Sequence, residues 1–177
     1  MKKILLFVSF VFSCACMMYA GNPVKVTTGK SWLKNLVKET AAIYVEFDWS
    51  NAKFDNEKAV VEDFQDDYDY IVESCASNFV EGFNDKAKSL KAQLTEEGAS
   101  YKLIVTITNI DTYFSVMSFI PGHKANLWCK LKCVSNATGE TVYEAEAEEV
   151  EGGRDSVRKD CFAKAFTELG TAVAKLK

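Results

Sequence analysis

The sequence predicts one α/β (α+β) domain, a two-layer sandwich in which two long helices cover one face of a mixed sheet of about five strands. Two long segments, residues 68–90 and 154–177, carry apolar side chains at steps of three and four, which is typical of amphipathic helices. Several shorter segments alternate apolar and polar residues, as half-buried strands do. The chain has 177 residues without a linker or an internal repeat, so residues 21–177 are expected to form a single domain.

Residues 1–20 have the layout of a secretory signal peptide. A basic start, Met1 to Lys3, precedes the largely apolar residues 4–12 and a segment with small residues that ends at Ala20. The apolar stretch is shorter than the roughly 20 residues of a membrane-spanning helix. Cleavage after Ala20 or after Ala15 fits the pattern. We therefore expect an exported protein, in the periplasm or associated with the outer membrane.

Two cysteines in this segment are candidate lipidation sites. Cys14 follows Val11-Phe12-Ser13, and Cys16 follows Cys14-Ala15. Lipid attachment favours a small residue in the middle of the preceding triplet, where Phe12 is large. The sequence leaves both a cleaved signal peptide and a lipid anchor open.

Residues 23–49 are expected to contain two strands separated by a short helix. Residues 23–28 fit a short strand, and residues 31–37 have apolar residues at helical spacing. Residues 42–49 alternate cleanly, with apolar side chains on one face only. The polar segment 51–67 is expected to hold a short helix or a crossover.

Residues 68–90 form the clearest expected helix. Gly82 lies inside it and costs about 1 kcal/mol relative to Ala, so this helix should pack against another element. Gly98 fits the exit from the helical segment. The apolar stripe consists of Tyr68, Ile71, Val72, Cys75, Phe79, Val80, Phe83, Ala87 and Leu90.

Three strands are expected next, at residues 101–110, 127–135 and 141–148. In the first strand, Ile104 and Ile110 fall on the outer face. The short connection between the second and third strands places Gly139 where a positive φ is needed. The third strand turns Glu144, Glu146 and Glu148 away from its apolar face, which discourages edge-to-edge pairing.

The closing helix, residues 154–177, is expected to begin at an N-cap formed by Asp155 or Ser156. Its apolar stripe runs from Cys161 to Leu176, and lysines at its end suit the negative end of the helix dipole.

The sequence contains little that indicates catalysis. His123 is the single histidine, it lies in a turn-like setting, and a catalytic histidine needs a partner to orient it. No cysteine pair has zinc spacing, and the acidic run 66–69 lacks the glycine and closing glutamate of a calcium loop. With 21 basic and 25 acidic residues, a broad nucleic-acid-binding face is not expected. We therefore expect no enzymatic activity, no cofactor and no metal.

Four cysteines lie beyond the signal segment, namely Cys75, Cys129, Cys133 and Cys161. Cys129 and Cys133 share one expected strand and lie about 13 Å apart, too far for a disulfide between them. We favour buried free thiols for all four, although export would permit disulfides that link helix to strand or helix to helix.

The connection 113–122 is unusually apolar for a surface segment. An exposed apolar patch often marks a contact with a partner, a ligand or a membrane. The competing interpretation is that residues 110–118 continue the strand, with their side chains covered by a helix. The candidate interaction residues are Tyr113, Phe114, Met117, Phe119, Ile120 and Pro121.

Residues 101–177 resemble a pattern in small exported proteins of unknown function from Bacteroidota and related Gram-negative bacteria. The matching pieces are residues 101–107, Ala137-Thr138-Gly139-Glu140-Thr141-Val142, and Phe166-Thr167-Glu168-Leu169-Gly170. These proteins are distantly similar to the N-terminal-type α/β domains of curli-assembly and Tol-associated envelope proteins. The resemblance implies an envelope protein that binds or assembles, and it supplies no catalytic residue.

Two functional hypotheses follow. The first is a non-catalytic envelope protein that contacts another protein or the membrane surface through residues 113–122 or a sheet edge. The alternative is a binding module for a small apolar or lipid-like ligand, held between helices and sheet near Phe79, Phe83 and Phe119. The partner, the ligand and the oligomeric state are left open by the sequence.

Overall fold

The computed structural model describes residues 22–29, 41–87, 90–116 and 121–176. These residues form a mixed α/β fold with one open sheet, in the order β1-β8-β7-β6-β2-β5, with β3 beside β6 and β4 beside β3. The strands are β1 (Val24–Thr28), β2 (Ala42–Asp48), β3 (Lys53–Phe54), β4 (Lys58–Ala59), β5 (Lys91–Gln93), β6 (Tyr101–Ser115), β7 (Gly122–Ser135) and β8 (Thr141–Glu151). The helices are α3 (Val60–Asp63), α4 (Tyr68–Lys86) and α5 (Asp160–Ala174).

The expectation of about five strands is wrong, because the described sheet has eight. The five expected strands are present as β1, β2, β6, β7 and β8. The other three contain only two or three residues each, which is too short to show an alternating pattern. Parallel pairing holds β5 against β2 and β3 against β6, so distant parts of the chain define these strands.

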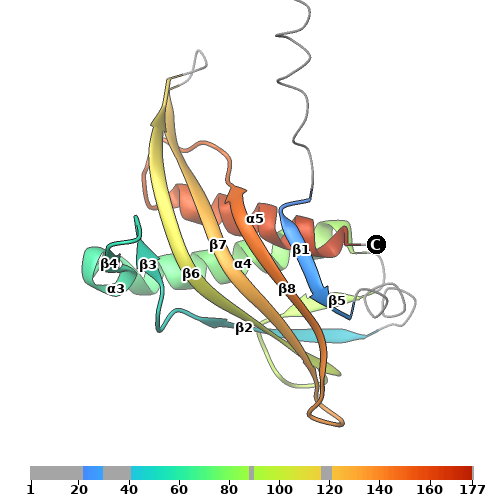
Figure 1. Cartoon of the computed structure of the whole chain (residues 1–177). Coiled ribbons are helices and arrows are strands. Elements are labelled where there is room, and N and C mark those ends of the chain that lie inside the picture. Colours follow the sequence, from blue (N-terminus) through green and yellow to red (C-terminus); the bar gives the residue numbers. More distant parts are fainter. Residues whose placement is uncertain (1–21, 30–40, 88–89, 117–120, 177) are drawn as a thin grey trace, which may run out of the picture.

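The helices α4 and α5 lie side by side on one face of the sheet (Figure 1). Aromatic rings join the two layers. The ring of Phe166 stacks on Trp49 with centroids 5.5 Å apart, and Phe79 meets Phe47 edge to face at 5.5 Å. No helix in the described ranges is long and apolar enough to cross a bilayer.

The contact between α4 and α5 explains the glycine inside the first long helix. A Cβ atom on Gly82 would lie 2.2 Å from the carbonyl oxygen of Thr167, and one on Gly170 would lie 2.2 Å from that of Phe79. The hydroxyl of Thr171 donates to the carbonyl of Gly82 at 3.2 Å. Backbones this close tolerate no side chain, so both positions require glycine.

Both long helices are shorter than expected. The first ends at Lys86, because the side chain of Asn84 binds the backbone of β5. Its amide group donates to Ala92 O at 2.9 Å, and its oxygen accepts from Ala92 N at 2.8 Å. The second starts at Asp160, and neither Asp155 nor Ser156 caps it, because Asp155 pairs with His123 through the backbone. Gly98 lies in the turn between β5 and β6, and the expected helix at 31–37 lies outside the described residues.

The strands β6, β7 and β8 form the central part of the sheet. Gly139 has φ +72° in the expected turn, and Tyr143, Ala145 and Ala147 face the core. A β-bulge between Ile107 and Asn109 corrects one assignment. Because the extra residue shifts the alternation, Ile110 is 1% exposed and faces the core, not the outer face.

Candidate interaction site

The hairpin formed by β6 and β7 projects beyond the helical layer (Figure 1). We call its described outer part, residues 111–116 and 121–126, the arm. The strand interpretation of this segment is correct as far as Ser115, and β7 begins at Gly122. The side chains at its end are not covered by a helix, however, since Phe114 is 58% exposed.

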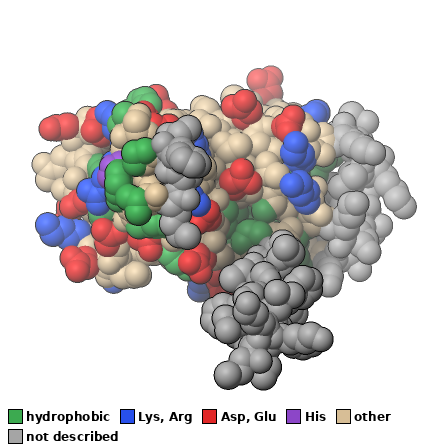
Figure 2. All heavy atoms as spheres, turned by 90° about the horizontal axis from the view of Figure 1, so that it is seen from above, with side chains coloured by type: hydrophobic (Ala, Val, Ile, Leu, Met, Phe, Trp, Pro, Cys, Tyr) green, Lys and Arg blue, Asp and Glu red, His purple; other side chains and the backbone are tan. Residues whose placement is uncertain are grey.

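One face of the arm is apolar. After the bulge, Ile110, Thr112, Phe114 and Val116 point to the same side of β6, because side chains alternate along a strand. Ile110 ends the covered part of this face, whereas Phe114 and Val116 are 58% and 71% exposed. Figure 2 shows hydrophobic side chains gathered beside the single histidine. His123 packs edge to face against Phe114 with ring centroids 5.4 Å apart.

The opposite face of the arm is held by polar contacts. The Tyr113 hydroxyl donates to the carboxylate of Glu151, and Lys124 forms an ion pair with the same carboxylate. Arg154 donates to Ser115 Oγ at 2.9 Å. Burial and the bond to Glu151 raise the pKa of Tyr113 to about 12. These contacts fix the arm to residues 151–154, so the apolar face has a defined orientation.

Residues 152–155 also cover the outer edge of β7. The backbone of His123 donates to Asp155 O at 2.8 Å and accepts from Asp155 N at 2.9 Å, and Gly152 N donates to Ala125 O at 2.8 Å. The Asp155 carboxylate lies 2.8 Å from Lys164, whose hydrogen bond lowers the pKa of that carboxyl. This segment is therefore anchored to α5, and the base of the arm with it.

Of the expected interaction residues, the structure describes Tyr113, Phe114 and Pro121. Phe114 lies on the apolar face of the arm beside His123, Tyr113 lies on the opposite face bound to Glu151, and Pro121 is exposed. Sequence reasoning missed Val116, the most exposed large apolar side chain in the described ranges. It also missed Glu151 and Arg154, which reach the arm from 25 or more positions away and carry no local signal. Five candidates lie outside the described residues: Met117, Phe119, Ile120, Cys14 and Cys16.

The expected setting of His123 is wrong, because it lies in β7 and not in a surface turn. Within the described part of the chain, no group of histidine, cysteine, aspartate or glutamate residues is arranged to hold a metal ion. The prediction of buried free thiols is confirmed for Cys75, Cys129, Cys133 and Cys161. Burial raises the pKa of each thiol, to about 12 for Cys129 and about 11 for Cys161.

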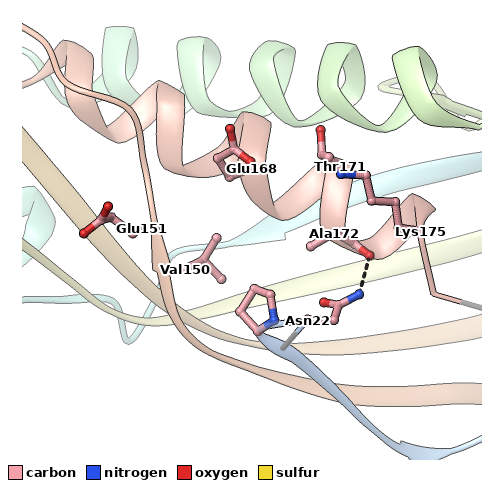
Figure 3. A pocket seen from close by; sticks show the side chains of 8 residues that line it. Asn22, Val150, Glu151, Glu168, Thr171, Ala172 and Lys175 are labelled. Atoms are coloured by element: carbon pink, nitrogen blue, oxygen red, sulfur yellow. Dashed lines mark hydrogen bonds between the residues drawn. The ribbon is translucent and has the colours of Figure 1, made fainter. Parts of the chain in front are cut away.

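The alternative ligand site near Phe79 and Phe83 is filled by the protein itself. Their side chains are 0% and 1% exposed, and their rings stack with centroids 6.3 Å apart. A groove of about 430 Å³ lies elsewhere, between α5, the end of β8 and the start of β1 (Figure 3). Asn22 closes one side of this groove by donating to Ala172 O at 3.1 Å. Its lining mixes carboxylates and a lysine with small apolar surfaces: Asn22, Pro23, Val150, Glu151, Glu168, Thr171, Ala172 and Lys175.

No protein-family model matches this chain, and no curated protein matches it. Among solved structures, the PelC dodecamer from Paraburkholderia phytofirmans is 10% identical, with 85% of this chain and 96% of that chain covered and a TM-score of 0.44. A neuraminyllactose-binding hemagglutinin homolog from Helicobacter pylori is 11% identical, with 78% and 83% covered and a TM-score of 0.41. Similarity at this level assigns neither a family nor a function.

Proposed function

We propose that this chain is a non-catalytic, exported protein of the cell envelope that binds another protein through the arm. The observation that carries this proposal is the exposure of Phe114 and Val116 on an arm whose other face is fixed by Glu151 and Arg154. An aromatic side chain that lies mostly in water contributes little to its own fold, and such patches mark contact surfaces.

The charges around the arm favour a protein partner over a membrane surface. Lys124 pairs with Glu151, Arg158 lies 3.8 Å from Asp55, and Lys164 pairs with Asp155. Basic groups already neutralised within the chain offer little attraction to anionic lipid headgroups, and the chain carries a net charge of −4. An apolar patch with a neutralised polar rim suits burial against an apolar protein surface.

The proposed location rests on the signal-like residues 1–20 and on the resemblance of residues 101–177 to exported envelope proteins of Bacteroidota. Mass spectrometry of protein recovered from the producing cells tests it. A mature N-terminus within residues 14–21 supports export, with or without a lipid, and an intact Met1 contradicts it.

The arm is tested with the double variant Phe114→Ser/Val116→Ser. Because both side chains are exposed, we expect its melting temperature to stay close to that of the parent, while cross-linked protein adducts in intact cells are lost. Val61→Ser is the matched control, since Val61 is 47% exposed on α3 and should leave the adducts unchanged.

Two outcomes contradict this function. A large loss of thermal stability in the double variant would show that the arm residues serve the fold. Phe114-dependent sedimentation with vesicles of phosphatidylethanolamine and phosphatidylglycerol, without any protein adduct, would assign the arm to a membrane surface.

A further inference from the structure

The backbone of Phe114 faces outward from the arm, on the edge of β6 that lies away from β7. His123 donates to Asp155 O at 2.8 Å and accepts from Asp155 N at 2.9 Å, so its backbone groups point away from β6. His123 is the β7 partner of Phe114, and in such an antiparallel pair both residues turn their backbone groups outward. The N–H and C=O of Phe114 therefore lie on the outer edge, where no described strand pairs with them.

Two side chains close this edge at the base of the arm. Thr112 N donates to the Asp55 carboxylate at 3.4 Å, and Arg158 Nε donates to Thr112 Oγ1 at 2.9 Å. Past this point the alternation of β6 turns the backbone groups of Val116 to the same side as those of Phe114. The open part of the edge therefore consists of the N–H and C=O groups of Phe114 and Val116.

Other edges of the described sheet are protected against a further strand. The edge strand β5 has three residues, and the edge strand β1 carries Lys25 and has an irregular register. Residues 152–155 cover the outer edge of β7. The segment Phe114-Ser115-Val116, in contrast, has no charge, proline or bulge. It lacks the features that normally prevent pairing with a strand of another chain.

We propose that the partner of the arm contributes an extended segment, which adds to the sheet as a new strand along Phe114 and Val116. This inference rests on the proposed function and names the chemistry of the partner. The segment has apolar side chains at every second position, because those beside Phe114 and Val116 fall on the apolar face of the arm. Its other side chains are polar, because they lie on the face where Tyr113 binds Glu151.

The open backbone groups favour an extended segment over a helix. Phe114 and Val116 are 58% and 71% exposed, and a partner that covers them also removes water from the backbone beside them. Buried N–H and C=O groups require hydrogen-bond partners. A helix has already used its own backbone groups within itself, whereas an extended segment presents N–H and C=O groups along its edge at the repeat of β6.

The shape of the molecule leaves room for this strand. The arm projects beyond the helical layer (Figure 1), so a strand added to it there does not meet α4 or α5. Because Asp55 and Arg158 occupy the edge at Thr112, the added strand does not reach β3. The new strand is therefore short, and its affinity depends on the exposed side chains of Phe114 and Val116 as well as on its hydrogen bonds.

Amide hydrogen exchange of the purified full chain, followed by NMR, tests whether the edge is open. We expect the Phe114 amide to exchange rapidly. The amides of Tyr113 and Ser115 face β7 and should exchange slowly, so they are the internal control. Slow exchange of Phe114 in the protein without a partner would show that its N–H is already bound, and would overturn this inference.

Phe114→Pro tests the added strand itself. This change removes the outward N–H, keeps an apolar side chain and leaves the β6–β7 hydrogen bonds in place. Phe114→Ala is the matched control, because it removes the ring and keeps the N–H. We expect the yield of formaldehyde-linked protein adducts in intact cells to be about tenfold lower for Phe114→Pro than for Phe114→Ala, which corresponds to one lost hydrogen bond.

Val116→Pro and Val116→Ala repeat this comparison beyond the last residue of β6. They decide the test if Phe114→Pro lowers the melting temperature, and we again expect fewer adducts from the proline variant. Proline variants that form as many adducts as their alanine controls would overturn the added strand and leave the proposed function standing, since the apolar face alone would then hold the partner. A parent that forms no adduct would contradict the proposed function and this inference together.

Discussion

Gly82→Ala should destabilise the protein, although the same change stabilises most helices. In an exposed helix interior, replacing glycine with alanine gains about 1 kcal/mol. Here the new Cβ would lie 2.2 Å from the carbonyl oxygen of Thr167 in α5, about 1 Å closer than a normal contact. The oxygen belongs to helix backbone, so relief requires α4 and α5 to move apart.

The cost of that movement follows from what the two helices hold. Separating them loosens the rings of Phe79 and Phe166 against the sheet and lengthens the 3.2 Å bond from Thr171 to Gly82. Overpacking of this kind costs about 3 kcal/mol at the upper end of its usual range. After the gain in helix propensity, the net loss is about 2 kcal/mol, or a fall in melting temperature of about 4–8 °C for a domain of this size.

Urea and thermal unfolding followed by circular dichroism measure this loss. Gly153→Ala is the matched control, because its new Cβ would meet only the flexible side chain of Lys164, and we expect little change. Gly170→Ala should resemble Gly82→Ala. The double variant should lose less than the sum, since helices already separated relieve both contacts. A Gly82→Ala protein as stable as the parent would refute the close-contact argument.

Three further predictions concern titration and thiols. Because the folded-state pKa of Tyr113 is raised to about 12, its stabilising contribution is full below pH 10 and is lost between pH 10 and 12. In Tyr113→Phe, the free energy of unfolding measured with urea should therefore fall less between pH 10 and 12 than it does in the parent. An equal fall in both proteins would contradict this prediction. The pKa of Asp155 is lowered from 3.8, mainly by its hydrogen bond from Lys164, so its contribution is present above pH 3.8 and lost as the pH falls through the folded-state value. The difference in free energy of unfolding between the parent and Asp155→Asn should therefore become smaller in acid. A difference that does not change with pH would contradict a stabilising pair of Asp155 and Lys164. The four buried thiols are those of Cys75, Cys129, Cys133 and Cys161. Ellman's reagent should label none of them before unfolding and all of them afterwards. Labelling of the folded protein at any of these positions would contradict their burial.

The elements that the sequence predicted correctly are those with a sustained period. The helix α4 keeps an apolar stripe over 19 residues, and β7 alternates over most of its 14. Such patterns can be recognised because buried residues recur at a constant spacing along the whole element. The strands β3, β4 and β5 have no room for a repeat, and their place in the sheet depends on partners far away in the chain.

The sequence did not predict where α4 ends or where α5 begins, because contacts outside the apolar stripe of each helix determine these positions. Asn84 binds both backbone groups of Ala92, so the chain leaves α4 soon afterwards to form β5. Residues 152–157 continue the expected apolar spacing poorly, and their backbone is bound by Ala125 and His123 of the arm. The apolar spacing of residues 152–157 cannot show that this segment pairs with the edge of β7 instead of forming the first turn of α5.

The candidate site was predicted only in its composition, because one inserted residue determines which way the arm faces. Counting alternate positions from Tyr101 places Ile110 on the outer face, and with it Phe114 and Val116. The bulge at Thr108 exchanges the two faces, and Asn109 fixes it by accepting from Asn56 N at 2.8 Å. The apolar side of the arm therefore continues the core side of the sheet, where Ile110 is covered and Phe114 is not. The exposed apolar side chains of the arm, Phe114 and Val116, are an extension of the hydrophobic core past the point where the helices end.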